Sequence, residues 1–147
     1  MNSQQAIGIF DSGIGGLTVA RAIKDILPNE DLIYFGDTAH LPYGDKSAEA
    51  IKSYSVKITE FLMTQHCKAI VIACNTASAV GFKAVQKTFK HPELVVNVID
   101  PVSERVALRK GIDKVGVIAT KRTVSTKAYS KRLLKLRKEL KVSEVAT

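Results

Sequence analysis

The amino-acid sequence predicts an α/β fold in which helices flank a parallel β-sheet. Short apolar runs alternate along the chain with longer stretches typical of helices, and five such pairs follow one another. The runs are rich in Val and Ile and end in small or polar residues, which is typical of buried strands. At 147 residues, with 46% hydrophobic residues, the chain is long enough to bury a sizeable core.

The elements are assigned in order from these runs. The predicted strands cover residues 6–10, 31–35, 68–73, 94–99 and 114–119. Each predicted strand is followed by a predicted helix. The first helix begins near Gly16, the second runs from Ser47 to Gln65, and the third ends near Lys90. The fourth runs from Pro101 to Lys110, and the fifth occupies the basic end of the chain. A helix that stops at a proline in the segment 90–95 indicates a boundary. We therefore expect a first domain at residues 1–92 and the start of a second at residues 93–147.

The net charge of +8 is concentrated in one segment. Residues 1–120 carry 13 Lys and Arg against 12 Asp and Glu, whereas residues 121–147 carry 9 against 2. In that segment Tyr129, Leu133, Leu136 and Leu140 are spaced to form one apolar helix face. A basic amphipathic helix can bind phosphates or membranes, but a solvated face on a packing helix is commoner. Because no aromatic residues alternate with the basic ones to stack on bases, we expect no nucleic-acid partner. We also expect no membrane partner, since the solvated face is the commoner case.

Several classes of protein are disfavoured by what the sequence lacks. No apolar run approaches the roughly 18 residues of a membrane span, and the first residues lack the zones of a signal peptide, so we expect a cytoplasmic protein. Cys67 and Cys74 stand at opposite ends of one predicted strand, too far apart for a disulfide. His40, His66 and His91 occur singly and no cysteines have metal spacing, so no metal site is expected.

Short polar residues follow every predicted strand. In chain order these are Asp11 and Ser12, then Gly36, Asp37 and Thr38 with the loop residues Pro42, Tyr43 and Gly44, then Cys74, Asn75 and Thr76, then Asp100, and finally Thr120. In a parallel sheet the strands' carboxyl ends lie at one edge, where ligands bind. Helix capping explains the Ser, Thr and Asp residues singly, but not a cysteine or a Pro-Tyr-Gly loop. For Cys74 alone, a buried structural cysteine is the simpler alternative.

The segment Asp-Ser-Gly-Ile-Gly-Gly does not match a nucleotide loop. Thr18 stands where a G-x-G-x-x-G motif needs its last glycine, and no Gly-Lys-Ser/Thr sequence occurs. The segment does place the Asp11 carboxylate and the Ser12 hydroxyl before the backbone amides of a helix start, which suits a carboxylate or other anion. Cys74 could then act as a base once its pKa is lowered from about 8.5. No histidine has an obvious place as the partner of a hydrolytic cysteine.

Five segments together resemble a known family. IGIFDSGIGGLTV, YFGDTAHLPYG, VIACNTASA, VIDPV and KVGVIAT occur in this order and are similar to the amino-terminal portion of the bacterial glutamate racemases, within the aspartate/glutamate racemase superfamily. The resemblance implies interconversion of L- and D-glutamate for peptidoglycan synthesis, no cofactor, and a homodimer. Aspartate racemases share the cysteine motif but are not similar at DSGIGG or PYG.

The resemblance also implies roles for individual residues. Cys74 resembles the catalytic cysteine that takes the α-proton from D-glutamate, and Asp11 resembles the carboxylate that assists proton transfer. The positions that resemble substrate-binding residues are Ser12, Tyr43, Gly44, Asn75, Thr76 and Thr120. Such a site is chemically sensible because the carbanion formed at the α-carbon must be stabilised by hydrogen bonds placed for it.

One feature of the family is missing from the sequence. The family's second catalytic cysteine lies in a segment like Gly-Cys-Thr-His, which does not occur here, and KVSEVAT resembles the start of a further strand of the second domain. We therefore expect an aspartate/glutamate racemase-like fold with an incomplete second domain, exposed apolar surface and no full racemisation. The alternatives are a non-catalytic half-racemase that binds an amino acid or a protein partner, and a superfamily member that acts on aspartate or a related diacid.

Overall fold

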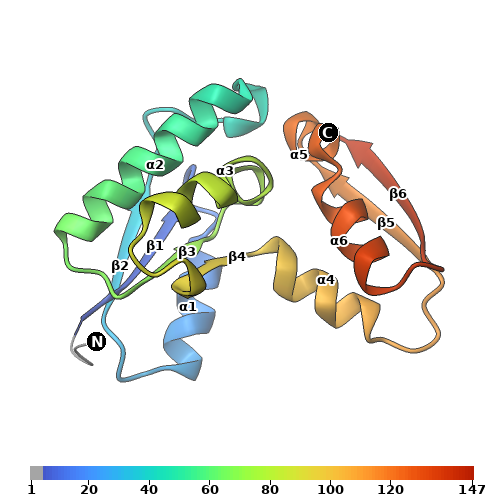
Figure 1. The fold of residues 1–147 in the computed structure, drawn as a ribbon, viewed down its shortest axis with the longest axis horizontal. Coiled ribbons are helices and arrows are strands. Elements are labelled where there is room, and N and C mark those ends of the chain that lie inside the picture. Colours follow the sequence, from blue (N-terminus) through green and yellow to red (C-terminus); the bar gives the residue numbers. More distant parts are fainter. Residues whose placement is uncertain (1–4) are drawn as a thin grey trace.

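The structure, a computed structural model that describes residues 5–147, contains two parallel sheets with helices packed against them (Figure 1). The first sheet has the order β2-β1-β3-β4, and its strands are Leu32–Gly36, Ile7–Asp11, Ala69–Ile72 and Val95–Asn97. In the second sheet β5 (Lys114–Ala119) pairs with β6 (Lys141–Ala146). The predicted α/β class with parallel strands is confirmed.

The fifth predicted strand does not join the sheet formed by the first four. The sequence suggested one common edge for all strand ends, whereas β5 pairs with β6 and starts a separate sheet. Helix α4 (Ile99–Ala107) carries the chain away from β4 to this second sheet (Figure 1). The boundary between residues 92 and 93 stays a prediction, but strand pairing places β4 with the first sheet.

The remaining helices are α1 (Leu17–Ile26), α2 (Ala48–Thr64), α3 (Asn75–Thr88), α5 (Lys121–Thr126) and α6 (Ala128–Leu136), with short 3-10 turns η1 (Tyr43–Asp45) and η2 (Pro92–Leu94). Alternation along β1 decides which face each helix covers, because successive strand side chains point to opposite faces. Ile7 and Ile9 pack with residues of α1, whereas Phe10 joins the larger core formed with α2 and α3.

Among the described residues, no helix is long and apolar enough to cross a membrane.

Helix α4 begins two residues earlier than the sequence predicted. The side-chain Oδ1 of Asn97 accepts hydrogen bonds from the backbone N–H groups of Ile99 and Asp100, both at 2.9 Å. These bonds satisfy two donors that the first turn of a helix leaves free, and they end β4 at the same residue. The apolar run had predicted a strand up to residue 99, since its hydrophobicity does not distinguish a strand from a helix start.

The basic end of the chain forms two helices and not one. Lys127 has a left-handed backbone (φ 54°) and separates α5 from α6. Leu133 in α6 is buried as predicted, while Leu140 is buried beyond the end of the helix. The Arg137 guanidinium donates to the carbonyl oxygens of Arg109 (3.1 Å) and Ile112, so this basic residue fastens the connection between α4 and β5.

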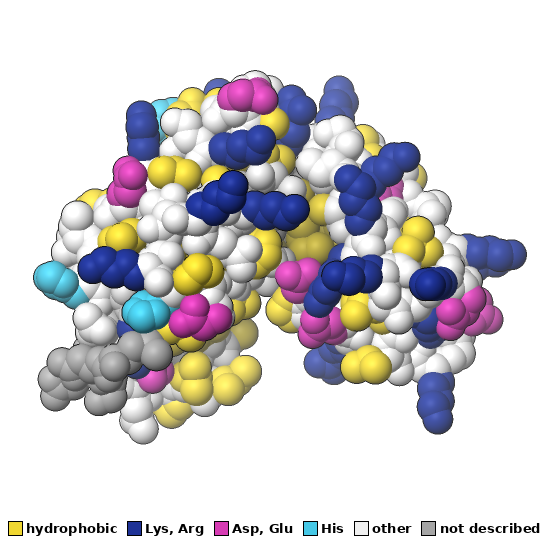
Figure 2. All heavy atoms as spheres, viewed as in Figure 1, with side chains coloured by type: hydrophobic (Ala, Val, Ile, Leu, Met, Phe, Trp, Pro, Cys, Tyr) yellow, Lys and Arg dark blue, Asp and Glu magenta, His cyan; other side chains and the backbone are white. Residues whose placement is uncertain are grey.

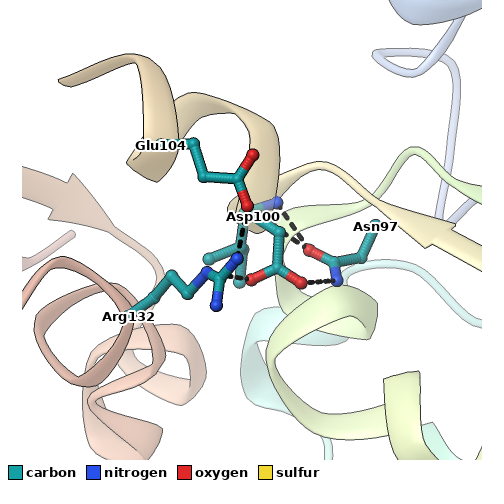
Figure 3. A network of polar contacts seen from close by, with 5 residues as sticks. Asn97, Asp100, Glu104 and Arg132 are labelled. Carbon is teal, nitrogen blue, oxygen red and sulfur yellow. Dashed lines mark hydrogen bonds and ion pairs between the residues drawn. The ribbon is translucent and has the colours of Figure 1, made fainter. Parts of the chain in front are cut away.

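Helix α6 is tied to α4 by a second arginine. Nε of Arg132 lies 2.9 Å from Oδ1 of Asp100, and its Nη2 contacts Glu104 (Figure 3). The other carboxylate oxygen of Asp100 accepts from Nδ2 of Asn97 at 2.8 Å, which connects the pair to the end of β4.

On the face shown in Figure 2, Lys and Arg side chains are spread over both halves of the molecule, the one with the first sheet and the one with the second. Acidic and apolar groups lie between them.

Helices α2 and α3 approach closely where α3 carries Gly81. A Cβ atom at this position would lie 2.7 Å from Oγ of Ser55 and 3.0 Å from its Cβ. Ser55 is fully buried and donates its hydroxyl to the carbonyl of Ile51 at 2.8 Å, so it has little freedom to move away. A small residue is therefore needed at position 81.

We expect Gly81→Val to lower the free energy of unfolding by about 1–3 kcal/mol, because the added side chain overpacks this contact. Urea unfolding followed by circular dichroism measures the change. Gly116→Val is the matched control, since nothing lies within 4 Å of a Cβ at that strand position. Equal stability of the two variants would contradict the packing argument.

Candidate functional site

A cavity of about 530 Å³ opens at the carboxyl ends of β1 and β3. The eight residues to which the resemblance gives roles all line it: Asp11, Ser12, Tyr43, Gly44, Cys74, Asn75, Thr76 and Thr120. Of the other residues predicted at this edge, Pro42 also lines the cavity, whereas Gly36, Asp37, Thr38 and Asp100 do not. Seven of the eight come from the first sheet and its loops, and Thr120 follows β5 in the second sheet. The cavity is therefore shared by both sheets, although the sheets do not pair with each other.

The Cys74 thiol caps the start of α3. Its sulfur accepts the backbone N–H of Ala77 at 3.4 Å and lies 3.4 Å from the Ser12 hydroxyl oxygen, to which it donates. Burial raises the pKa of the thiol, and the negative charge of Asp11 raises it further, whereas the hydrogen bonds with Ser12 and Ala77 lower it. The net pKa shift is upward, so the free protein carries a neutral thiol at pH 7.

Asp11 ends β1 and is held by the loop that follows it. Its Oδ2 accepts the backbone N–H of Gly16 at 2.9 Å and the hydroxyl of Tyr34 at 3.4 Å. A Cβ at Gly16 would lie 2.8 Å from the Cβ atoms of both Ala73 and Asp11, so only glycine lets the loop close over β3. Burial, followed by the charge of Asp11, raises the pKa of Tyr34 to about 12, which keeps this phenol a hydrogen-bond donor.

The Tyr43 phenol is directed at Asp37, a strand-end residue to which the resemblance gives no role. Its hydroxyl donates to Oδ2 of Asp37 at 2.6 Å, and Nδ1 of His40 lies 2.8 Å from the other oxygen of Asp37. Tyr43 is 1% exposed, and its burial together with the Asp37 bond raises the pKa of the phenol. Tyr43 therefore acts as a buried, protonated anchor of the loop that borders the cavity.

Three threonine hydroxyls form a cluster between the sheets. Oγ1 of Thr76 lies 3.0 Å from Oγ1 of Thr120, and Thr123 contacts the same two oxygens at 3.3 and 3.0 Å. Thr123, on α5, was missed in the sequence because it lies 47 residues from Thr76 and belongs to no motif. On the other side of η1, Nε of Arg122 donates to the carbonyl of Lys46 at 2.9 Å.

A second cavity of about 510 Å³ adjoins the first and is bordered by α4, β5 and α6. Asn75 and Thr120 line both cavities, whereas Cys74 and Asp11 line only the first. Among residues 5–147, no group of three His, Cys, Asp or Glu side chains is arranged to hold a metal ion.

The fold and the cavity define an α/β protein with a ligand site built around a thiol and a carboxylate at strand ends. Residues 15–147 match the family described as Asp/Glu/Hydantoin racemase, and the chain belongs to this family.

Individual relatives are similar over almost the whole chain. It is 49% identical over 138 residues to the glutamate racemase of Geobacter metallireducens, which covers 94% of this chain and 50% of that protein. The crystal structure of Francisella tularensis glutamate racemase in complex with D-glutamate matches 97% of the chain with a TM-score of 0.88 at 42% identity. Isoform RacE1 of the Bacillus anthracis enzyme matches 99% with a TM-score of 0.91 at 40% identity. The chain spans about half the length of these relatives.

The pKa of Cys74 gives a direct test of this electrostatic arrangement. We expect the pH midpoint of Cys74 alkylation by iodoacetamide to lie above the ordinary thiol value of about 8.5. Asp11→Asn removes a negative charge and should move the midpoint down, whereas Ser12→Ala removes a stabilising hydrogen bond and should move it up. Mass spectrometry of the Cys74 peptide measures the rate at each pH.

The control for charge removal is Asp25→Asn, because Asp25 is 69% exposed on α1 and does not line the cavity. Shifts in the same direction for Asp11→Asn and Ser12→Ala would contradict the opposing effects assigned to these two residues.

Proposed function

We propose that this chain carries the part of a glutamate racemase site that binds glutamate and removes the α-proton of D-glutamate with Cys74. The observation that carries the proposal is the convergence of the Cys74 thiol, the Asp11 carboxylate and several neutral hydrogen-bond donors on one cavity. The relatives named glutamate racemase, one of them in complex with D-glutamate, support glutamate as the substrate.

The cavity has the chemistry to hold an amino acid. Its described lining contains no Lys or Arg, so substrate carboxylates would be bound by neutral donors such as the hydroxyls of Ser12 and Thr76 and the amide of Asn75. The substrate ammonium group would pair with Asp11, whose charge otherwise disfavours the Cys74 thiolate. The ammonium group therefore lowers the cost of ionising Cys74 at the moment when a base is needed, in opposition to the substrate carboxylates.

The proposed step is a proton transfer. The Cys74 thiolate takes the proton from the α-carbon, which leaves a neutral thiol and a carbanion delocalised into the adjacent carboxylate. Hydrogen bonds from the neutral donors stabilise the charge that develops there. The thiol then exchanges its proton with the solvent, and return of a proton from the same thiol restores D-glutamate. In heavy water the returned particle is therefore a deuteron.

Inversion of the centre needs a second acid on the opposite face. The titratable side chains in the described lining are Asp11, Tyr43 and Cys74, and the Tyr43 hydroxyl is already bonded to Asp37. For residues 5–147 we therefore propose exchange without inversion. Racemisation by the whole protein, its role in peptidoglycan synthesis, the cytoplasmic location and the homodimer remain predictions.

The second candidate is a non-catalytic half-racemase that binds an amino acid. The raised pKa of Cys74 favours it, because a thiol that stays protonated when the substrate binds cannot remove a proton. Both candidates predict binding of D-glutamate, and only the first predicts exchange.

Incubation in heavy water with D-glutamate, followed by proton NMR of the α-position, separates the two candidates. We expect exchange from D-glutamate and none from L-glutamate. Cys74→Ala should slow the exchange by about 100-fold or more, the usual contribution of a positioned base. Cys67→Ala is the matched control, since Cys67 is a buried cysteine at the other end of β3 that lies outside this cavity.

Binding of D-glutamate without exchange, in a sample shown to be folded by circular dichroism, would favour the half-racemase. Inversion of either enantiomer would contradict the assignment of a single base to the cavity.

A further inference from the structure

Tyr129 reaches a predicted substrate-binding residue from the other half of the molecule. It lies on α6, and its hydroxyl donates to Oδ1 of Asn75 at 2.6 Å across 54 residues of sequence. Tyr129 lines the second cavity and not the one that contains Cys74, whereas Asn75 borders both. The hydroxyl therefore contacts the Cys74 cavity only through the side chain of Asn75.

We propose that Tyr129 is a positioning residue that fixes the amide of Asn75 so that its N–H groups, and not its oxygen, face the substrate. The proposal rests on the proposed function, because it assumes that the cavity next to Asn75 receives the carboxylates of an amino acid.

The orientation of the Asn75 amide decides whether it offers a ligand a donor or an acceptor. An asparagine side chain has an oxygen that accepts and an NH₂ group that donates, and the two are nearly identical in shape. An amide that is free to turn over presents either group to a ligand. The amide oxygen of Asn75 is bound to Tyr129, so Nδ2 points away from the Tyr129 hydroxyl. Among residues 5–147, no acceptor is hydrogen-bonded to Nδ2. Two N–H donors are thus available to an anion.

Tyr129 is suited to enforce this orientation. Burial raises the pKa of its phenol, so the group stays protonated and can act as the donor in this bond. Helix α6 is itself held in place, since Leu133 is buried and Arg132 binds Asp100 and Glu104 on α4 (Figure 3). Helix α6 in the second half of the structure therefore sets the orientation of the Asn75 amide, which belongs to the first half.

The orientation of the amide matters because the lining of the Cys74 cavity, within residues 5–147, contains no Lys or Arg. Neutral donors are the groups left to bind carboxylates there, and an amide turned the wrong way replaces an attraction by a repulsion between two oxygens. Loss of the Tyr129 hydroxyl should therefore weaken substrate binding even though Tyr129 does not touch the substrate.

A double-mutant cycle tests the inference. The dissociation constant of D-glutamate is measured by NMR titration for the parent chain, Tyr129→Phe, Asn75→Ala and the double variant. We expect Tyr129→Phe to raise the constant about three- to tenfold, as for the loss of one hydrogen bond. In the Asn75→Ala background the same change should have no further effect, because the residue through which Tyr129 acts is gone.

Tyr54→Phe is the matched control, because Tyr54 is a partly buried tyrosine on α2 that lines neither of the two cavities. An equal rise for Tyr129→Phe in both backgrounds would overturn the inference and indicate a general structural effect. If Tyr129→Phe did not raise the dissociation constant in the chain that keeps Asn75, the inference would be overturned as well.

A measurement without ligand separates this inference from the proposed function. In ¹⁵N–¹H spectra of the free protein, we expect the side-chain NH₂ signals of Asn75 to move in Tyr129→Phe and to stay in Tyr54→Phe. Unchanged signals would overturn the inference. If the parent chain binds no D-glutamate, the proposed function fails, and a shift of these signals would still support the positioning of the amide.

Discussion

The start of α3 is the junction on which the cavity depends. Three consecutive side chains there bind three different parts of the chain: Cys74 contacts Ser12 after β1, Asn75 contacts Tyr129 on α6, and Thr76 contacts Thr120 after β5. The contacts of Asn75 and Thr76, together with that of Thr123 with Thr76, join the two halves at the cavity. Net hydrogen-bond energies are only about 0.5–1.5 kcal/mol each, so the junction is held by several weak contacts acting together.

The two halves differ in how firmly each is built. In the first, both faces of the sheet are covered, and Ile9, Phe10, Ile70 and Ile72 are fully buried. In the second, Ile118 and Val145 are 77% and 60% exposed on strands β5 and β6. Cys74 and Asp11 therefore stand on well-packed elements, whereas Thr120 and Tyr129 stand on elements with less packing around them in this chain, which spans about half the length of its relatives.

The sequence predicted the fold class, and it predicted which strand-end residues line the cavity around Cys74, because both depend on local pattern. Runs such as residues 68–73 identify strands, and the residues that follow them converge at strand ends for reasons of topology alone. Thr123 and Tyr129 could not be assigned their contacts in this way. Each acts through its hydroxyl oxygen on a partner 47 or 54 residues away, which the topology and not the sequence spacing brings near, and the sequence indicates Tyr129 only as part of an apolar helix face.

The separate second sheet was missed for a related reason. A strand pattern shows that β5 is extended but not which strand it pairs with, and its partner β6 was recognised only as the possible start of a strand. Likewise, hydrophobicity continued the fourth strand to residue 99, while a side-chain bond from Asn97 turned the chain into a helix. The left-handed residue Lys127 has no sequence signal at all, since lysine rarely adopts this conformation.

The charge balance around Cys74 favours one kind of ligand. Burial and the Asp11 charge both disfavour a thiolate, so a second anion alone in the cavity would raise the cost of ionising the thiol further. A ligand that also carries a cation beside Asp11 offsets that cost, because the cation attracts both the carboxylate and the thiolate. An α-amino acid meets this requirement, and a hydroxy acid or dicarboxylic acid without an amino group does not. The elevated pKa of Cys74 is then compatible with its proposed use as a base, because a cationic group of the ligand beside Asp11 would act against the charge that raises this pKa.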